Sequence, residues 1–131
     1  NNLSNVLQDI LDTPVSPELL PPKDGMISQK TENLVGPYEL HDFYMYYVLR
    51  YGFSPEKILL LADNSSLPYS HELKLHWLRN FYTRFFAQQF KRSCMPDGVK
   101  VGTISLSPRG DWKMPSDSSC AVWLEQIDKL K

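Results

Sequence analysis

Residues 89–102 hold the side chains best suited to chemistry, because they put two cations side by side. Lys91 and Arg92 stand at the end of an aromatic-rich stretch with helical spacing, and a Pro-Asp-Gly turn at 96–98 follows. A helix C-terminus stabilises a nearby cation by roughly 0.3–1 kcal/mol, so two solvated end-of-helix charges are one interpretation. Recognition of an anion such as a phosphate or carboxylate is the other.

The charge distribution along the chain leaves these two interpretations open. The net charge is only −1, but residues 1–42 carry seven acidic side chains against two basic ones, a net of −5. Residues 67–117 carry eight basic side chains against four acidic ones, a net of +4. The basic part can meet an external anion or pair with the acidic part of its own chain.

Other chemical signatures are weak or missing in this sequence. His71 and His76 are five residues apart, not the four that places two metal ligands on one helix face, so we expect no metal site. No GxSxG elbow, Walker loop or Rossmann glycine fingerprint occurs, and no catalytic residue is predicted. Basic residues alternate with aromatic ones over residues 79–92, as in proteins that stack single-stranded nucleic acid. At helical spacing, however, the aromatic residues share a core face, and we expect no nucleic-acid binding.

Size and composition are those of one compact soluble domain. The 131 residues are 42% hydrophobic and 22% charged, and no apolar run is long enough for a membrane span. The first residues lack the basic and apolar regions of a signal peptide. With only two cysteines, Cys94 and Cys120, a disulfide framework is not expected, and we predict reduced thiols in a cytoplasmic protein. The chain has no initiator Met, which suggests a piece of something larger.

The elements that must position the cations are mainly helical. Apolar periodicity, Pro37, Ser54-Pro55-Glu56, Ser70 and Gly52 serve as start and stop signals. They predict about five helices, at residues 2–12, 37–51, 54–62, 70–92 and 118–130. The only plausible strand is short, at residues 99–106. Residues 13–36 form a long proline-rich loop without period, and the length of such a loop favours a functional site.

Four motifs, in order along residues 13–115, resemble the C-terminal part of glutamine-dependent NAD+ synthetases. The family patterns are Pro-(Ser/Thr)-Ala-(Glu/Asp)-Leu, then Gln-x-Asp-Glu … Leu-Gly-x-Pro-Tyr … Asp, then hydrophobic-Lys-Arg … Pro-x-Gly-x-Lys-Val, then Arg-Asp-x-Arg-x-Pro. The matching residues are Thr13-Pro14-Val15-Ser16-Pro17-Glu18-Leu19, Gln29-Lys30-Thr31-Glu32 with Leu34, Gly36, Pro37, Tyr38 and Asp42, Phe90-Lys91-Arg92 with Pro96, Gly98, Lys100 and Val101, and Gly110-Asp111-Trp112-Lys113-Met114-Pro115.

The resemblance implies a role in joining ammonia to deamido-NAD. In that family ATP adenylates the nicotinate carboxylate, and ammonia drawn from glutamine in a separate glutaminase domain displaces AMP. It implies a larger Rossmann-like α/β synthetase domain of which residues 1–131 are the C-terminal segment, with 13–36 as a substrate-site loop. ATP and Mg2+ serve the complete enzyme, a homo-oligomer, whereas this segment alone is expected to bind neither and to be inactive.

Residue by residue, the resemblance implies three binding positions. Ser16 matches a hydroxyl residue against ATP, and Phe90 and Lys91 match a pair against deamido-NAD. The chain also departs from the family pattern, with Thr31 where Asp is frequent, Phe90 where His or Tyr is frequent, Ser93 in place of Arg, and Ser116-Asp117-Ser118 in place of Ile-Thr-Asn. Beside this assignment stand two other classes, a helical interaction module without catalytic activity and a nucleic-acid binder.

Overall fold

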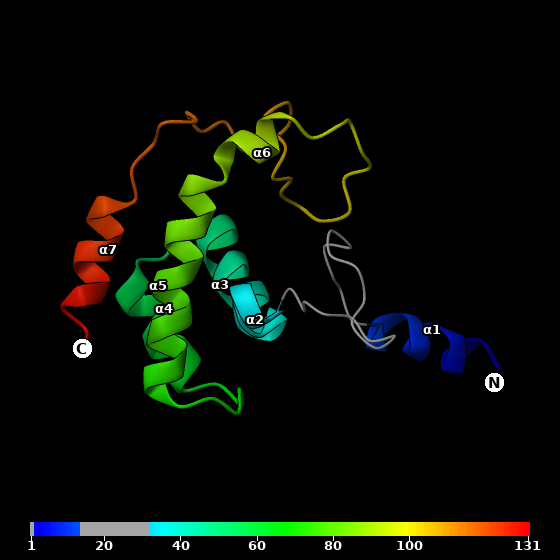
Figure 1. Cartoon of the computed structure of the whole chain (residues 1–131), viewed down its shortest axis with the longest axis horizontal. Coiled ribbons are helices and arrows are strands. Elements are labelled where there is room, and N and C mark those ends of the chain that lie inside the picture. Colours follow the sequence, from blue (N-terminus) through cyan, green and yellow to red (C-terminus); the bar gives the residue numbers. More distant parts are fainter. Residues whose placement is uncertain (1, 14–31) are drawn as a thin grey trace, which may run out of the picture. The chain divides into compact units, whose positions relative to one another are not determined.

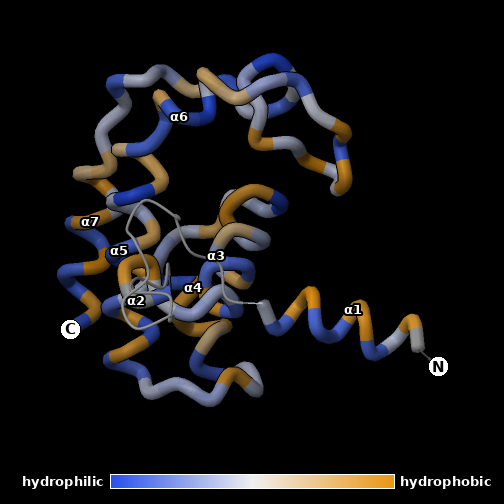
Figure 2. Tube along the Cα trace, turned by 45° about the vertical axis from the view of Figure 1, so that its right-hand side comes forward, coloured by the Kyte–Doolittle hydropathy of each residue, from blue (hydrophilic) through white to orange (hydrophobic). Residues whose placement is uncertain are grey.

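A computed structural model describes residues 2–13 and 32–131, and the chain divides into two parts at Gly36 and Pro37. The first part contains α1 (Asn2–Asp12) and α2 (Glu32–Val35). The helix predicted at residues 2–12 is therefore confirmed. Figure 2 shows apolar and polar residues alternating along α1, and its apolar residues are exposed, Leu3 and Leu11 by 72% and 77%. The single turn of α2 lies within the predicted loop and was not anticipated. Most of that loop, residues 14–31, falls outside the described residues.

The second part begins with α3 (Tyr38–Tyr51), which the sequence predicted within one residue. Pro37 lies just before the helix as its N-cap, rather than in the first turn. Gly52 ends the helix in the left-handed region at φ 62°, and its N–H bonds back to the Val48 carbonyl at 3.0 Å. Glycine adopts this conformation without the steric penalty that a Cβ brings. For that reason Gly52 could be predicted from the sequence to mark the end of the helix.

Serine caps begin the next two helices, α4 (Pro55–Asp63) and α5 (His71–Ala87), as predicted. The hydroxyl of Ser54 accepts from the Lys57 N–H at 3.4 Å, and that of Ser70 accepts from the Leu73 N–H at 3.3 Å. Each bond satisfies one of the backbone donors that a helix start leaves unpaired.

Two expected boundaries differ from the structure. The helix predicted over residues 70–92 is interrupted at Gln88 and continues as α6 (Gln89–Ser93). The last helix, α7 (Ala121–Asp128), begins three residues later than predicted. In place of a helix start at Ser118, the hydroxyl of Ser119 accepts from the Ala121 N–H at 3.2 Å, a local turn that competes with helix formation.

The core of residues 37–131 is built around α5, which contacts α3, α4, α6 and α7. Figure 1 shows α5 between α7 and α3. Buried apolar side chains from four helices meet there: Leu40 and Tyr44 of α3, Ile58, Leu59 and Ala62 of α4, Leu78, Phe81, Tyr82 and Phe85 of α5, and Ile127 of α7. The stripe at residues 78–85 follows the spacing that predicted a core-facing helix.

The strand expected at residues 99–106 is not present. This run is irregular, and Val99 and Val101 are 91% and 97% exposed. A strand needs a neighbour to pair its N–H and C=O groups, and the described part of the chain forms no strand that could supply one. The prediction of a mainly helical chain with at most one short strand is confirmed. In the described ranges, no helix is long and apolar enough to cross a membrane.

Candidate anion-binding site at α6 and the tail

The structure joins the third and fourth motifs into one region, formed by α6 and residues 94–120, called here the tail. The Lys100 ammonium of the third motif lies 2.7 Å from the Asp111 carboxylate of the fourth. The same carboxylate accepts from the Ser105 N–H at 2.7 Å. At the other end of the fourth motif, the Gln89 side-chain amide donates to the Met114 carbonyl at 3.0 Å. Residues separated by up to 25 positions are thus fixed against each other.

Further contacts fix the tail against itself and against α5. Arg109 pairs with Asp97 at 2.5 Å and also donates to the Met95 carbonyl. The ring of Trp112 packs edge-on against Phe85 with 5.6 Å between the ring centroids. Exposed ion pairs contribute little to stability one by one, about 0–1 kcal/mol. Together with the ring contact of the partly buried Trp112, however, they give an irregular segment a defined course.

The two adjacent cations, Lys91 and Arg92, have different environments. The Arg92 side chain is partly buried, donates through Nε to the Gln89 Oε1 at 2.8 Å, and donates through Nη2 to the Phe85 carbonyl. Burial lowers the pKa of Arg92 from its ordinary value. Lys91 is exposed and forms no ion pair with any residue that the structure describes. Only Arg92 departs from the simple picture of solvated end-of-helix charges.

Phe90 is the other predicted contact for deamido-NAD, and the residue is 52% exposed. An exposed ring next to an exposed ammonium can combine stacking with charge pairing toward a flat anionic ligand. Phe90 and Lys91, neighbours in the sequence, are thus both exposed on α6. Ser16, the predicted ATP contact, lies outside the described residues, as does Thr31.

Two of the three basic side chains of the tail are paired within the tail itself, which the sequence did not reveal. Lys100 and Arg109 belong to the basic region that suggested an anion site, yet both pair with carboxylates of the tail itself. The hydrogen bond with Lys100, followed by that from Ser105, lowers the pKa of Asp111. The sequence does not indicate these ion pairs, because the paired residues are far apart along the chain and meet only when the tail folds back. The net positive charge of residues 67–117 therefore overstates the number of cations that are available to a ligand.

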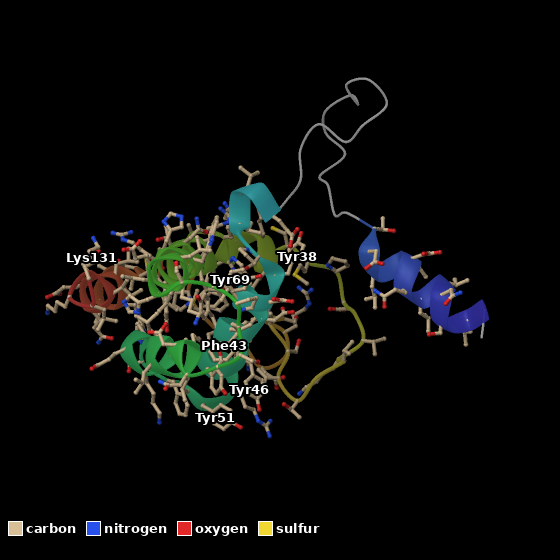
Figure 3. The ribbon with its side chains drawn as sticks, turned by 90° about the horizontal axis from the view of Figure 1, so that it is seen from below. Tyr38, Phe43, Tyr46, Tyr51, Tyr69 and Lys131 are labelled. Carbon is tan, nitrogen blue, oxygen red and sulfur yellow. The ribbon has the colours of Figure 1, made fainter. Side chains whose placement is uncertain are left out.

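A concave region lies between α3 and the tail. Its volume is about 250 Å3, and its lining is mostly apolar, with contributions from Met45, Tyr46 and Leu49 of α3 and Ile104 of the tail. At its edge Arg50 donates to the Thr103 hydroxyl at 2.6 Å. Figure 3 shows Tyr46 and Tyr51 next to each other, and their hydroxyls are 3.2 Å apart.

The tyrosines of α3 lie in two different environments. Tyr44 is fully buried and donates to the Lys74 carbonyl at 2.8 Å, whereas Tyr46 and Tyr51 are about half exposed at 53% and 51%. The excess of tyrosine reflects both environments, because the ring is apolar and the hydroxyl tolerates water.

Metal binding finds no support from side-chain clusters. Within residues 2–13 and 32–131, no three His, Cys, Asp or Glu side chains are grouped as metal ligands would be. Cys94 and Cys120 are both free thiols.

Comparison with known proteins gives a consistent picture. The chain is 42% identical to the glutamine-dependent NAD(+) synthetase of Mycobacterium leprae, and 44% identical to those of Mycobacterium bovis and Mycobacterium tuberculosis (strain H37Rv). Each match covers 97% of this chain but only 21–22% of the relative. No family profile and no solved structure matches the chain.

The resemblance predicted from the four motifs is thereby confirmed over nearly the whole chain. The chain spans about a fifth of the length of the curated relatives it matches, so it corresponds to one region of a much longer enzyme. We conclude that this chain is, along almost its entire length, a relative of one region of the glutamine-dependent NAD(+) synthetases.

Proposed function

We propose that the chain is the C-terminal segment of a synthetase that amidates deamido-NAD to NAD+ at the expense of ATP. The observation that carries this proposal is the identity of 42–44% across 97% of the chain to enzymes of that name. The exposed Phe90 and Lys91 on α6 support it, because a dinucleotide needs a cation for its charged groups and a flat surface for its rings.

In this proposal Lys91 supplies the chain's main contribution to deamido-NAD binding. An ammonium on a flexible stem can reach a carboxylate or a pyrophosphate oxygen and keep its charge throughout the reaction. Negative charge shifts at the nicotinate carboxylate as the acyl-adenylate forms and breaks, and a fixed cation nearby stabilises that change. Ser16, in the 13–36 loop, contacts ATP. No group of described residues has the makeup of a metal site, so we assign no ligand of the Mg2+ that accompanies ATP to them.

The proposed partners are the rest of the synthetase domain, with its Rossmann-like core, and a glutaminase domain that delivers ammonia. The apolar stripe of α1 supports such a partner, because five large aliphatic side chains of one short helix are exposed by 53–77%. A stripe of that kind is normally covered in a stable protein. We further propose that the complete enzyme is a cytoplasmic homo-oligomer.

The test is to assay the complete protein that contains this chain with deamido-NAD, ATP, Mg2+ and either glutamine or ammonia. We expect NAD+, AMP and pyrophosphate in equal amounts with both nitrogen donors. A complete protein that forms no NAD+ under these conditions would contradict the proposal. The isolated chain, assayed with ammonia, should form none, and turnover above the blank would show that it is not merely a segment.

A further inference from the structure

Gln89 is an unusual side chain for its position, because it is polar and completely buried. Its exposed fraction is 0%, and among the described residues only Lys74 is another buried polar or charged side chain. A buried primary amide is costly unless both its donor and its acceptor are satisfied. In Gln89 both are, since Nε2 donates to the Met114 carbonyl at 3.0 Å and Oε1 accepts from Arg92 at 2.8 Å.

Arg92 extends this connection to the end of α5. Its guanidinium lies 4.2 Å from the centroid of the Phe85 ring and donates to the Phe85 carbonyl. The chain Met114–Gln89–Arg92–Phe85 therefore connects the fourth motif, α6 and α5 through side-chain hydrogen bonds. The side-chain amide of Gln89 is paired at both its donor and its acceptor, and partly buried hydrogen bonds of this kind favour a single arrangement.

Because α6 is a helix, the hydrogen bonds of Gln89 and Arg92 also determine the direction in which Phe90 and Lys91 point. Successive residues of an α-helix are rotated by roughly 100°, so residues 89 and 92 share one side. Residues 90 and 91 then lie on the opposite side, in agreement with the exposure of Phe90 and Lys91. When Gln89 and Arg92 are held against the protein interior, Phe90 and Lys91 must therefore face solvent in one defined direction.

We propose that Gln89 is a positioning residue for deamido-NAD binding, acting through the orientation of Lys91. This inference rests on the proposed function, and it assigns a specific task to a residue that does not itself contact the substrate. The lysine stem is flexible, so only a fixed backbone beneath it keeps the ammonium within reach of one anionic group.

A double-mutant cycle in the complete enzyme tests the inference. Gln89→Met is close in shape but makes neither hydrogen bond, and we expect it to lower kcat/KM for deamido-NAD about three- to tenfold. The change should appear in KM for deamido-NAD and leave glutamine hydrolysis unaltered. In a Lys91→Ala background the same substitution should have an effect of less than about twofold, because nothing remains to be positioned.

Tyr44→Phe is the matched control, because it also removes one buried hydrogen bond, that from the Tyr44 hydroxyl to the Lys74 carbonyl. Lys74 lies in the first turn of α5 and Gln89 beyond its last. We expect this control to leave kcat/KM for deamido-NAD unchanged within about twofold, since it loosens the core without touching α6.

Two results would overturn the inference and are distinguishable. If Lys91→Ala itself is without effect, the proposed deamido-NAD contact fails and the positioning role fails with it. If Lys91→Ala is damaging but the effects of Gln89→Met and Lys91→Ala simply multiply, only the positioning role is wrong. Should Gln89→Met give no folded enzyme, Gln89→Glu replaces it in the cycle, because its carboxylate still accepts from Arg92 but cannot donate to Met114. The same criterion then decides.

Discussion

Arg92 donates to the carbonyl of Phe85, seven residues earlier, while its guanidinium lies over the ring of the same residue. In a continuous helix that carbonyl would serve the backbone N–H of Gln89. A side chain thus occupies a backbone acceptor at the interruption between α5 and α6. The adjacent Lys91 remains in solvent, so two neighbouring cations have separate tasks, one structural and one available to a ligand.

Replacing Lys91 by Ala in the complete enzyme should selectively weaken the use of deamido-NAD. Loss of a charge-assisted hydrogen bond costs about 1.5–3 kcal/mol, which corresponds to a drop of roughly 10- to 150-fold in kcat/KM for deamido-NAD. Lys91→Arg should restore only part of the loss, because a planar guanidinium does not replace a compact ammonium. Steady-state assays with varied deamido-NAD measure both effects.

Lys129→Ala is the matched control for this charge deletion. Lys129 is also exposed, and among the described residues it pairs only with Glu125, one helical turn earlier in α7. Its removal should change kcat/KM by less than about twofold, since surface pairs of this kind contribute little. Equal, small effects of the Lys91 and Lys129 substitutions would mean that Lys91 is simply a solvated charge.

The core around α5 predicts a clear contrast between two leucines. Leu78 is fully buried, and Leu78→Ala should lower the free energy of unfolding by about 2–5 kcal/mol, because it leaves a cavity in the core cluster around α5. Leu60 on α4 is 61% exposed, and Leu60→Ala should change the free energy of unfolding by no more than about 0.5 kcal/mol. Urea unfolding followed by circular dichroism measures both values, and similar values would argue against this packing.

The left-handed end of α3 predicts opposite effects for two glycine substitutions. A Cβ at Gly52 or at Gly98 would meet no atom within 4 Å, so neither change creates a clash. Gly52 has φ 62°, and Gly52→Ala should destabilise the fold by about 1–2 kcal/mol through the backbone alone. Gly98→Ala carries no such penalty and should be neutral or stabilise by up to about 1 kcal/mol. Thermal unfolding that ranks Gly98→Ala below Gly52→Ala would contradict the assigned conformation.

Asp111 predicts how the tail responds to acid. The Lys100 hydrogen bond and the Ser105 N–H lower the pKa of Asp111 below its ordinary 3.8. Because the folded pKa is the lower one, the stabilisation is present above the unfolded pKa and is lost as the pH falls through the folded pKa. An NMR titration of the Asp111 carboxyl should give a midpoint below 3.8 that rises in Lys100→Ala. A midpoint that Lys100→Ala leaves in place would show that this pair does not hold the tail in solution.

Local signals were enough to predict most of the helices. Ser54, Ser70 and Gly52 act through bonds to residues only a few positions away, so their effects are visible in a short window of sequence. A short window of sequence does not predict the interruption at Gln88, because neither glycine nor proline marks the break there. Propensity at residues 99–106 favoured a strand, but a strand also needs a neighbour, and the described residues provide none.

The candidate site was only partly visible in the sequence, for a related reason. The third motif drew attention to Phe90 and Lys91, whose exposure suits a binding role that stays a prediction. Gln89 and Arg92 carry equally ordinary residue types, and their tasks depend on Met114 and Phe85, which only the folded chain brings within reach. No spacing rule distinguishes a lysine that faces solvent from an arginine that folds back.

The positions of the two cysteines make it possible to follow the tail by fluorescence spectroscopy. Its two ends are the only cysteines of the chain, Cys94 directly after α6 and Cys120 directly before α7, and both are free thiols. Because Cys94 is exposed and Cys120 is partly exposed, both can be reached by a thiol-specific dye without adding a cysteine. A fluorescent donor and an acceptor dye attached to these two thiols would report the end-to-end distance of the tail as substrates are added, without any change to the natural sequence.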